Sequence, residues 1–174
     1  MRWRPFRYRQ HLYDLCHLDP NTVVYTQPAK GDRPERRYVV DVHYSHHCFT
    51  RGMKPEEPLD PELSYSDRVF DFGRWKLSLL LPDIVRALAQ TKCYHTGKGN
   101  FFTIQVIDDA GNKAEYEVFF ETYVRRNGKK SRLNLVVQSA YVRDWKHSNR
   151  PHTKLIRFEV ILYNVMNGRE IKTP

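Results

Sequence analysis

The sequence has few cysteines and no long hydrophobic run, and both scarcities exclude whole classes of protein. Three cysteines among 174 residues are an odd number and form no Cys-x-x-Cys pair, which argues against a disulfide framework. The longest apolar stretch, Leu77 to Leu81, is interrupted by Ser78 and falls far short of the roughly 18 residues of a membrane span. The opening residues, MRWRPFRYRQ, lack the apolar core of an export signal. We therefore expect a cytoplasmic protein with reduced thiols and no membrane partner.

The sequence signatures of common enzyme classes are also missing. Residues 93–100 (CYHTGKGN) contain two glycines and a lysine, but they lack the spacing of a phosphate-binding loop and precede a strand-like run. No Gly-x-Ser-x-Gly or His-Glu-x-x-His pattern occurs. The missing phosphate-loop spacing argues against nucleotide hydrolysis, and we expect no cofactor.

Positive charge is what the chain has in abundance. Lysine and arginine number 29 against 20 acidic residues, which gives a net charge of +9 and a pI near 9.5. Such a surplus attracts polyanions, because each neutralised phosphate releases condensed counterions. Nucleic acid is therefore the first candidate partner. The alternative is a basic protein that its charge simply keeps in solution.

The first half of the chain carries strand, loop and helix signals in that order. Two strand-like runs, 23–27 and 37–45, predict an N-terminal hairpin. A flexible loop rich in proline and charge is expected at 51–66. Apolar residues at intervals of three and four predict a helix from 73 to 91, in which Pro82 either kinks the helix or begins a second one.

The second half alternates between apolar and polar residues, which is typical of strands with one buried face. Four strands are expected around residues 102–106, 116–120, 133–137 and 156–162. Asn127-Gly128 is a favoured hairpin dipeptide between the second and third of them. We therefore predict one α+β domain over 1–174, with an N-terminal β-hairpin region (1–50), a central helix and a C-terminal four-stranded antiparallel meander. The helix would cover the buried face of the meander within 73–165.

One turn of the predicted meander concentrates cations that could contact phosphates. A basic hairpin tip can bridge phosphates or follow a single strand. The alternative is a solvated turn whose charges protect the sheet edge. The candidate nucleic-acid-binding residues are Arg125, Arg126, Lys129, Lys130 and Arg132 of the tip, together with Lys98 of the segment 93–100.

Histidines and one strand end supply candidates for acid–base chemistry. His43, His46 and His47 cluster at the end of a predicted strand, and histidine titrates in the range useful for proton transfer. Tyr141 and Arg143 are two residues apart and would share a face. The predicted catalytic set is His46, His47, His95, Tyr141 and Arg143. Alternatively, Tyr141 extends the core and Arg143 pairs with Asp144 or Asp41.

The order of a helix followed by a meander that ends in QSAYVRD resembles the barnase–colicin–RelE class of small ribonucleases over residues 73–165. The resemblance is to RelE-like and BrnT-like toxins in particular. It implies a metal-independent endoribonuclease that cleaves RNA through the 2′-hydroxyl. A histidine or tyrosine would take the proton, Arg143 would hold the phosphate, and a cognate antitoxin would be a protein partner.

Two other functions stay open from the sequence. One is a non-catalytic module from a phage or mobile element that binds nucleic acid or protein. The other is a zinc-stabilised interaction domain, whose ligands would have to converge from three distant segments. Its candidate ligands are Cys16, His47, Cys48, Cys93 and His95.

Overall fold

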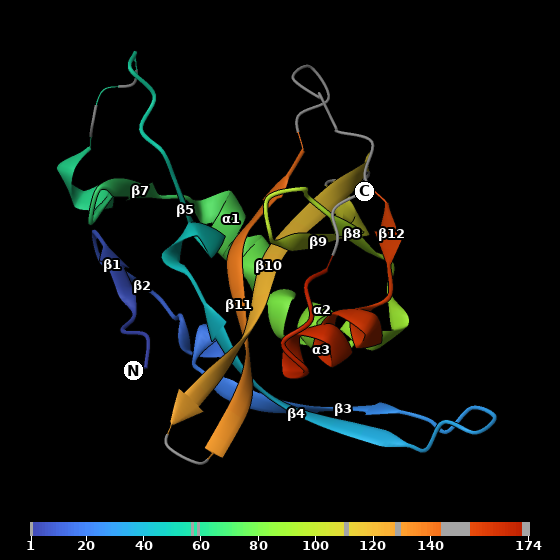
Figure 1. Cartoon of the computed structure of the whole chain (residues 1–174). Coiled ribbons are helices and arrows are strands. Elements are labelled where there is room, and N and C mark those ends of the chain that lie inside the picture. The colour runs from blue at the N-terminus through green and yellow to red at the C-terminus, as the bar shows by residue number, and fades with distance from the viewer. Residues whose placement is uncertain are drawn as a thin grey trace.

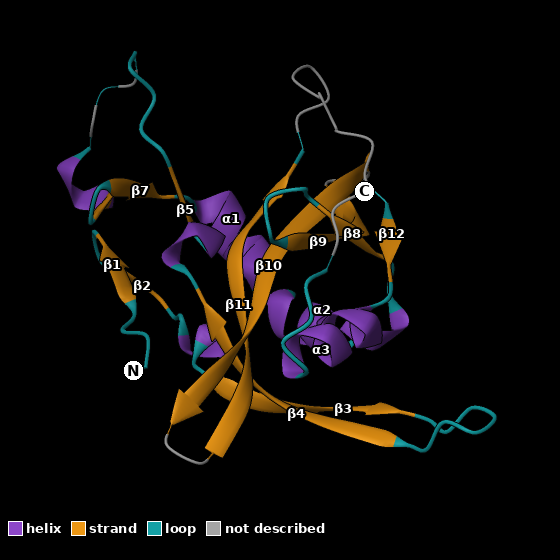
Figure 2. Cartoon of the chain, in the orientation of Figure 1, coloured by secondary structure: helices purple, strands orange, loops and turns teal. Residues whose placement is uncertain are grey.

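A curled seven-stranded sheet forms the centre of the molecule (Figures 1 and 2). The structure is a computed structural model, and it describes residues 2–56, 58, 60–109, 112–127, 130–143 and 154–171. The strand order across the sheet is β12-β8-β9-β10-β11-β4-β3. The strands are β3 (Asn21–Gln27), β4 (Arg36–Tyr44), β8 (Cys93–His95), β9 (Phe101–Asp109), β10 (Asn112–Asn127), β11 (Lys130–Val142) and β12 (Leu155–Ile156).

All neighbours in this sheet are antiparallel except one pair. β11 runs parallel to β4, with Leu133 opposite Val40 and Val137 opposite Tyr44. This pairing joins the N-terminal hairpin β3–β4 to the rest of the sheet, so the two halves of the chain share one layer. Asn127 lies opposite Lys130, which confirms the predicted hairpin between β10 and β11.

Two small sheets lie beside the large one. β1 (Phe6–Tyr8) pairs with β2 (His11–Tyr13), and β7 (Arg68–Phe70) lies between β5 (Thr50–Arg51) and β6 (Ser64–Tyr65). Aromatic rings join the two sheets, because Phe6 stacks on Phe70 with ring centroids 4.1 Å apart. The N-terminal aromatic residues therefore pack inward.

The helices are short. They are α1 (Phe72–Ser78), α2 (Leu81–Arg86) and α3 (Phe158–Met166), with single 3₁₀ turns η1 (Cys16–Leu18), η2 (His46–Cys48), η3 (Pro61–Leu63) and η4 (Leu88–Gln90). The carboxylate of Asp71 caps α1 by accepting the backbone N–H of Arg74 at 2.9 Å. Pro82 lies in the first turn of α2, where its missing N–H costs no helical hydrogen bond. Pro82 therefore lies at the start of a second helix and does not kink a single long one.

The predicted fold class, an α+β domain with a central helix and a C-terminal four-stranded antiparallel meander, is wrong. The region 73–91 is broken into α1, α2 and η4. Strands do form at the first three predicted meander positions. At the fourth, only Ile156 belongs to a strand, and residues 158–162 belong to helix α3. The sheet continues beyond β11 through the parallel strand β4 of the N-terminal hairpin. The molecule is a mixed, mostly β structure in which the short helices α2 and α3 pack on the core face of the large sheet (Figure 2).

The hydrophobic core lies between the sheet and the helices α2 and α3 (Figure 1). Phe158 of α3 makes edge-on ring contacts with Tyr25 at 4.8 Å and with Phe120 at 5.9 Å. The hydroxyl of Tyr25 donates a 2.6 Å hydrogen bond to the carbonyl of Val85 in α2. Full burial of a large apolar side chain stabilises a fold by about 1.5–3 kcal/mol, so these contacts fix both helices on the sheet.

The regular structure described within residues 52–66 consists of two short elements, η3 and β6. Residues 57 and 59 lie outside the described part of the chain, and the flexibility of the loop stays a prediction. No helix among the described residues has both the length and the apolar character needed to cross a membrane.

Candidate functional site

Strand alternation sends one set of polar side chains to the sheet face opposite the core. On β4, Val40 and Val42 are buried against the helices, so Asp41 and His43 point the other way. On β11, the buried Leu133 and Leu135 likewise leave Arg132 and Asn134 on the other face. We call the sheet face that carries these four polar side chains the outer face.

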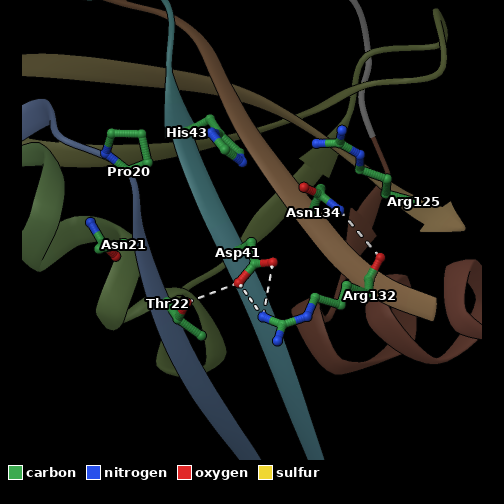
Figure 3. A pocket seen from close by; sticks show the side chains of 8 residues that line it. All are labelled: Pro20, Asn21, Thr22, Asp41, His43, Arg125, Arg132 and Asn134. Atoms are coloured by element: carbon green, nitrogen blue, oxygen red, sulfur yellow. Dashed lines mark hydrogen bonds and ion pairs between the residues drawn. The ribbon is translucent and has the colours of Figure 1, made fainter. Parts of the chain in front are cut away.

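An open groove of about 510 Å³ lies on the outer face where β3, β4, β10 and β11 meet. Its size falls in the range of typical ligand sites. Figure 3 shows the side chains that line it, which are Pro20, Asn21, Thr22, Asp41, His43, Arg125, Arg132 and Asn134. Apart from Pro20, every lining residue is polar or charged.

Asp41 anchors one side of the groove. Its carboxylate accepts a hydrogen bond from the Thr22 hydroxyl at 2.9 Å, and both of its oxygens lie 3.3 Å from Nη1 of Arg132. The Arg132 side chain is nevertheless 64% exposed, whereas that of Asp41 is 25% exposed. Asp41 therefore orients the guanidinium of Arg132 and leaves most of it open to solvent.

Arg125 supplies the second cation of the groove. It lies directly opposite Arg132 in the β10–β11 ladder and is exposed. Within the described part of the chain it forms no hydrogen bond or ion pair. Tyr123, which is 42% exposed, has the same orientation on β10 and lies opposite Asn134. Among the described residues the groove thus has an unpaired guanidinium, and the exposed ring of Tyr123, which does not itself line the groove, lies opposite the lining residue Asn134.

A second, smaller hollow extends the groove toward the N-terminus. It measures about 190 Å³ and shares Pro20 and His43 with the first. Arg2 and Trp3 contribute to its lining, and Arg2 is exposed. The two hollows together form a track on which Arg2, Arg132 and Arg125 supply positive charge.

Two of the predicted catalytic residues lie in η2. The rings of His46 and His47 meet edge to face with centroids 4.6 Å apart. Partial burial lowers the pKa of His47, and the neighbouring cation Arg68 adds to the effect. Arg74 donates a 3.2 Å hydrogen bond to the carbonyl of His47, and its guanidinium lies 5.4 Å from the ring centre of Tyr141. His47 and Tyr141 therefore share a neighbour.

His95 lies on the other side of the sheet from Tyr141. Its ring packs on Phe101 at 5.0 Å, and Phe101 packs on Phe120, which faces the core. Tyr141 instead stacks on Phe119, which has the opposite orientation on β10. The imidazole Nδ1 of His95 accepts the backbone N–H of Gly97 at 2.9 Å, and the side chain is buried.

Arg143 is held by a buried carboxylate. Its Nε and Nη2 donate to the two oxygens of Glu117 at 2.6 Å and 2.9 Å, and Glu117 is fully buried. The predicted partner Asp41 pairs with Arg132 instead, and Asp144 lies outside the described residues. Lys98 is exposed and lines a separate hollow of about 220 Å³ that Arg143 also borders. The five predicted catalytic residues thus share no single cavity among those described.

The predicted basic tip is divided between the two faces of β10. Arg125 and Arg132 line the groove, whereas Arg126 is exposed on the opposite face. Lys129 and the side chain of Lys130 lie outside the described residues. The sequence interpretation missed Asp41 and Asn134 as parts of the groove. The alternation of residues 37–45 places Asp41 and His43 on one face of the strand, but nothing local in the sequence indicates that β11 pairs beside them.

The residues of the zinc alternative do not form a ligand set. Cys16 donates to the carboxylate of Asp14 at 2.9 Å, and the buried Cys48 lies 3.7 Å from the carbonyl of Val137. His95 points toward the loop that follows β8, where it is bonded to Gly97. Over the described ranges of the chain, no group of three or more histidine, cysteine or acidic residues is arranged to hold a metal ion.

Fold and groove together define a basic protein that carries an open, arginine-lined groove on one face of a mixed sheet. The sequence model of the YjaZ family matches residues 5–166, so the chain belongs to that family. The protein YjaZ of Escherichia coli (strain K12) is 31% identical over 180 residues, which cover 99% of this chain and 96% of the relative. No solved structure matches the chain. The resemblance to ribonuclease toxins stays a prediction.

Proposed function

We propose that this protein binds single-stranded RNA along the outer-face groove and does not cleave it. The observation that carries the proposal is the groove itself, in which two exposed arginines from neighbouring strands face one open hollow. Phosphate contacts of this kind dominate the affinity of basic proteins for nucleic acid. The net charge of +9 acts in the same direction at long range.

Each group of the groove has a role in this proposal. Arg125 and Arg132 bind phosphate oxygens, for which the planar guanidinium fork is well suited. Asp41 keeps Arg132 in place. Tyr123 offers a ring face to an unpaired base, and such stacking contributes about 1–3 kcal/mol per base. The exposed amide of Asn21 can hydrogen-bond a base edge.

Binding is favoured over cleavage by the positions of the predicted catalytic residues. Cleavage through the 2′-hydroxyl requires a base and a cation within reach of the same phosphate. His95 lies on the core side of the sheet, and Arg143 is bonded to the buried Glu117. The proposed place of action is the cytoplasm, because the three free cysteines suit a reducing compartment.

The test is a titration of labelled single-stranded RNA, followed by fluorescence anisotropy over a range of salt concentrations. The double variant Arg125→Ala/Arg132→Ala should weaken binding and should reduce the slope of log affinity against log salt by roughly 1.4, since each single-strand phosphate contact contributes roughly 0.7. Arg126→Ala is the matched control, because it removes an exposed arginine from the opposite face of the same strand. An equal loss per removed arginine in both variants would mean that general charge, and not the groove, attracts RNA.

The same titration distinguishes RNA from other polyanions and binding from cleavage. Single-stranded DNA and duplex RNA of equal length serve as competitors, and the recovered RNA is run on a denaturing gel. We expect intact RNA at the end of the incubation. RNA that is cut by the wild type and left intact by His43→Ala would replace the proposal with a nuclease whose base lies in the groove.

A variant of Asp41 should strengthen RNA binding, whereas the arginine variants should weaken it. Asp41→Asn removes the negative charge from the groove and frees the guanidinium of Arg132. Binding should become several-fold tighter. The cost to folding should stay below about 1 kcal/mol, as for other solvent-exposed ion pairs. Weaker binding by this variant would show that the position of Arg132 matters more than the charge that Asp41 brings.

A further inference from the structure

The free edge of the large sheet lacks the protection that edge strands usually have. β3 is the last strand in the order and pairs with β4 on one side only. Soluble proteins usually blunt such edges with lysines, prolines or bulges within the strand. The chain is 28% charged, yet the seven residues of β3, NTVVYTQ, include no charged side chain and no proline. Its pairing with β4 also runs without a register shift.

The backbone of β3 is available on this free side. No backbone group of β3 bonds to a segment other than β4 within the described part of the molecule. Val24 is 45% exposed and lies opposite Val39, which is 49% exposed. The edge therefore offers both unpaired backbone groups and an apolar side chain at the middle of the strand.

The sequence around β3 is a chemical palindrome. Residues 20–28 read PNTVVYTQP, and Val24 is the central residue. Counting outward from Val24, a valine matches a tyrosine, a threonine matches a threonine, an asparagine matches a glutamine and a proline matches a proline. When two copies of such a strand pair antiparallel about their centre, each residue meets a chemically similar one.

We propose that two copies of this protein associate by pairing β3 with β3 in antiparallel orientation, about a twofold axis that passes beside Val24. Val24 meets Val24 of the second copy, and Thr22 meets Thr26 on the same face. On the other face Val23 meets Tyr25, and β-branched–aromatic pairs of this kind are favourable in sheets. Pro20 and Pro28 limit the contact to seven residues at both ends. The two seven-stranded sheets become one continuous sheet.

This interface is isologous, as in most homodimers, because the same strand serves on both sides. A second copy is the occupant that the strand itself specifies, since any other partner strand would have to supply the same order of side chains independently. The proposal does not depend on RNA binding, and its experiments contain no RNA.

The test is sedimentation velocity of the purified 174-residue chain at several concentrations. The wild type should sediment as a species of twice the 20.8 kDa chain mass. Val24→Lys places a charge on the axis and should give the single-chain mass at the same concentrations. Val39→Lys is the matched control, because it changes an equally exposed valine on the same face, one strand further in. This control should remain dimeric.

Three outcomes would overturn the proposal. They are a wild type that sediments as a single chain at every concentration, a Val24→Lys variant that stays dimeric, and equal dissociation of both lysine variants. Circular dichroism and melting curves verify that the variants are folded. Since Val24 is substantially exposed, the lysine side chain can reach solvent in the monomer.

Disulfide trapping tests the register independently. Val24→Cys is introduced together with Cys16→Ser, because Cys16 is the exposed one of the three native cysteines. Two cysteines directly opposite each other across the axis have Cα atoms about 4.5–5.5 Å apart, within the range that a disulfide spans, so mild oxidation should link them. Val39→Cys in the same background should stay unlinked. Linkage through position 39 and not through position 24 would contradict the pairing.

Discussion

The variant Arg143→Ala distinguishes two roles for Arg143. In the structural role Arg143 neutralises the buried Glu117, and in the chemical role predicted from the sequence it holds a phosphate. The side chain of Arg143 is 15% exposed, and it is bonded through two nitrogens to the fully buried carboxylate of Glu117. Removing one partner of a buried ion pair costs about 3–5 kcal/mol, because the other charge stays buried without compensation. For a chain of this size each kcal/mol shifts Tm by about 2–4 °C, so we expect a fall of roughly 6–20 °C.

The assay is urea unfolding followed by tryptophan fluorescence, with calorimetry for Tm. Arg125→Ala is the control, since it removes an exposed arginine from the outer face and should change the free energy of unfolding by less than about 0.5 kcal/mol. The paired replacement Glu117→Leu/Arg143→Met should recover much of the loss, because buried ion pairs can often be exchanged for apolar residues. If Arg143→Ala unfolds like the wild type but loses an RNA-dependent activity, the structural role assigned to Arg143 is wrong.

Three further predictions concern the core and the thiols. Tyr116→Phe should stabilise the protein by up to about 1 kcal/mol in urea unfolding, because the buried Tyr116 hydroxyl has no hydrogen-bond partner in the described structure. Phe158→Ala should cost about 3–5 kcal/mol in the same assay, since this ring joins α3 to the sheet, and a loss below about 1 kcal/mol would contradict that packing. A thiol reagent at pH 8 should modify one cysteine in the native protein, Cys16, because it is exposed, although its hydrogen bond to Asp14 raises its pKa. Burial raises the pKa of Cys48 and of Cys93 to about 12 and keeps the reagent away from both thiols. Rapid modification of all three thiols before unfolding would contradict the burial of the other two.

Local sequence patterns predicted several elements of the fold correctly. Alternation around residues 102–106, 116–120 and 133–137 identified three strands, because each has one face against the core and the other away from it. The hairpin β3–β4 was predicted from two strand-like runs and a connector that contains glycine and proline.

Residues 156–162 show why the predicted fold class was wrong. The apolar residues Ile156, Phe158, Val160 and Leu162 alternate as in a strand, but Phe158, Ile161 and Leu162 also recur at the spacing of a helix. The helical set is the buried one, and Val160 is 42% exposed. In a segment this short both periods fit, and packing against Tyr25 and Phe120 decides between them.

The sequence predicted only half of the groove, because the other half depends on pairing between strands that are distant in the sequence. The basic tip identified Arg125 and Arg132 from composition alone. The other half of the groove, Asp41 and His43, is brought there by the parallel pairing of β4 with β11, two strands that are distant in the sequence. No local period or turn signal encodes such a pairing, because it depends on how the whole sheet curls.

The most direct test of the proposed binding face is photo-crosslinking of a single-stranded RNA that carries 4-thiouridine, followed by mass spectrometry of the linked peptides. The structure predicts crosslinks on the outer face, to the peptides that contain Tyr123 and His43, and a loss of these crosslinks in Arg125→Ala/Arg132→Ala. Crosslinks confined to the face that carries Arg126, or an unchanged pattern in the double variant, would contradict the account.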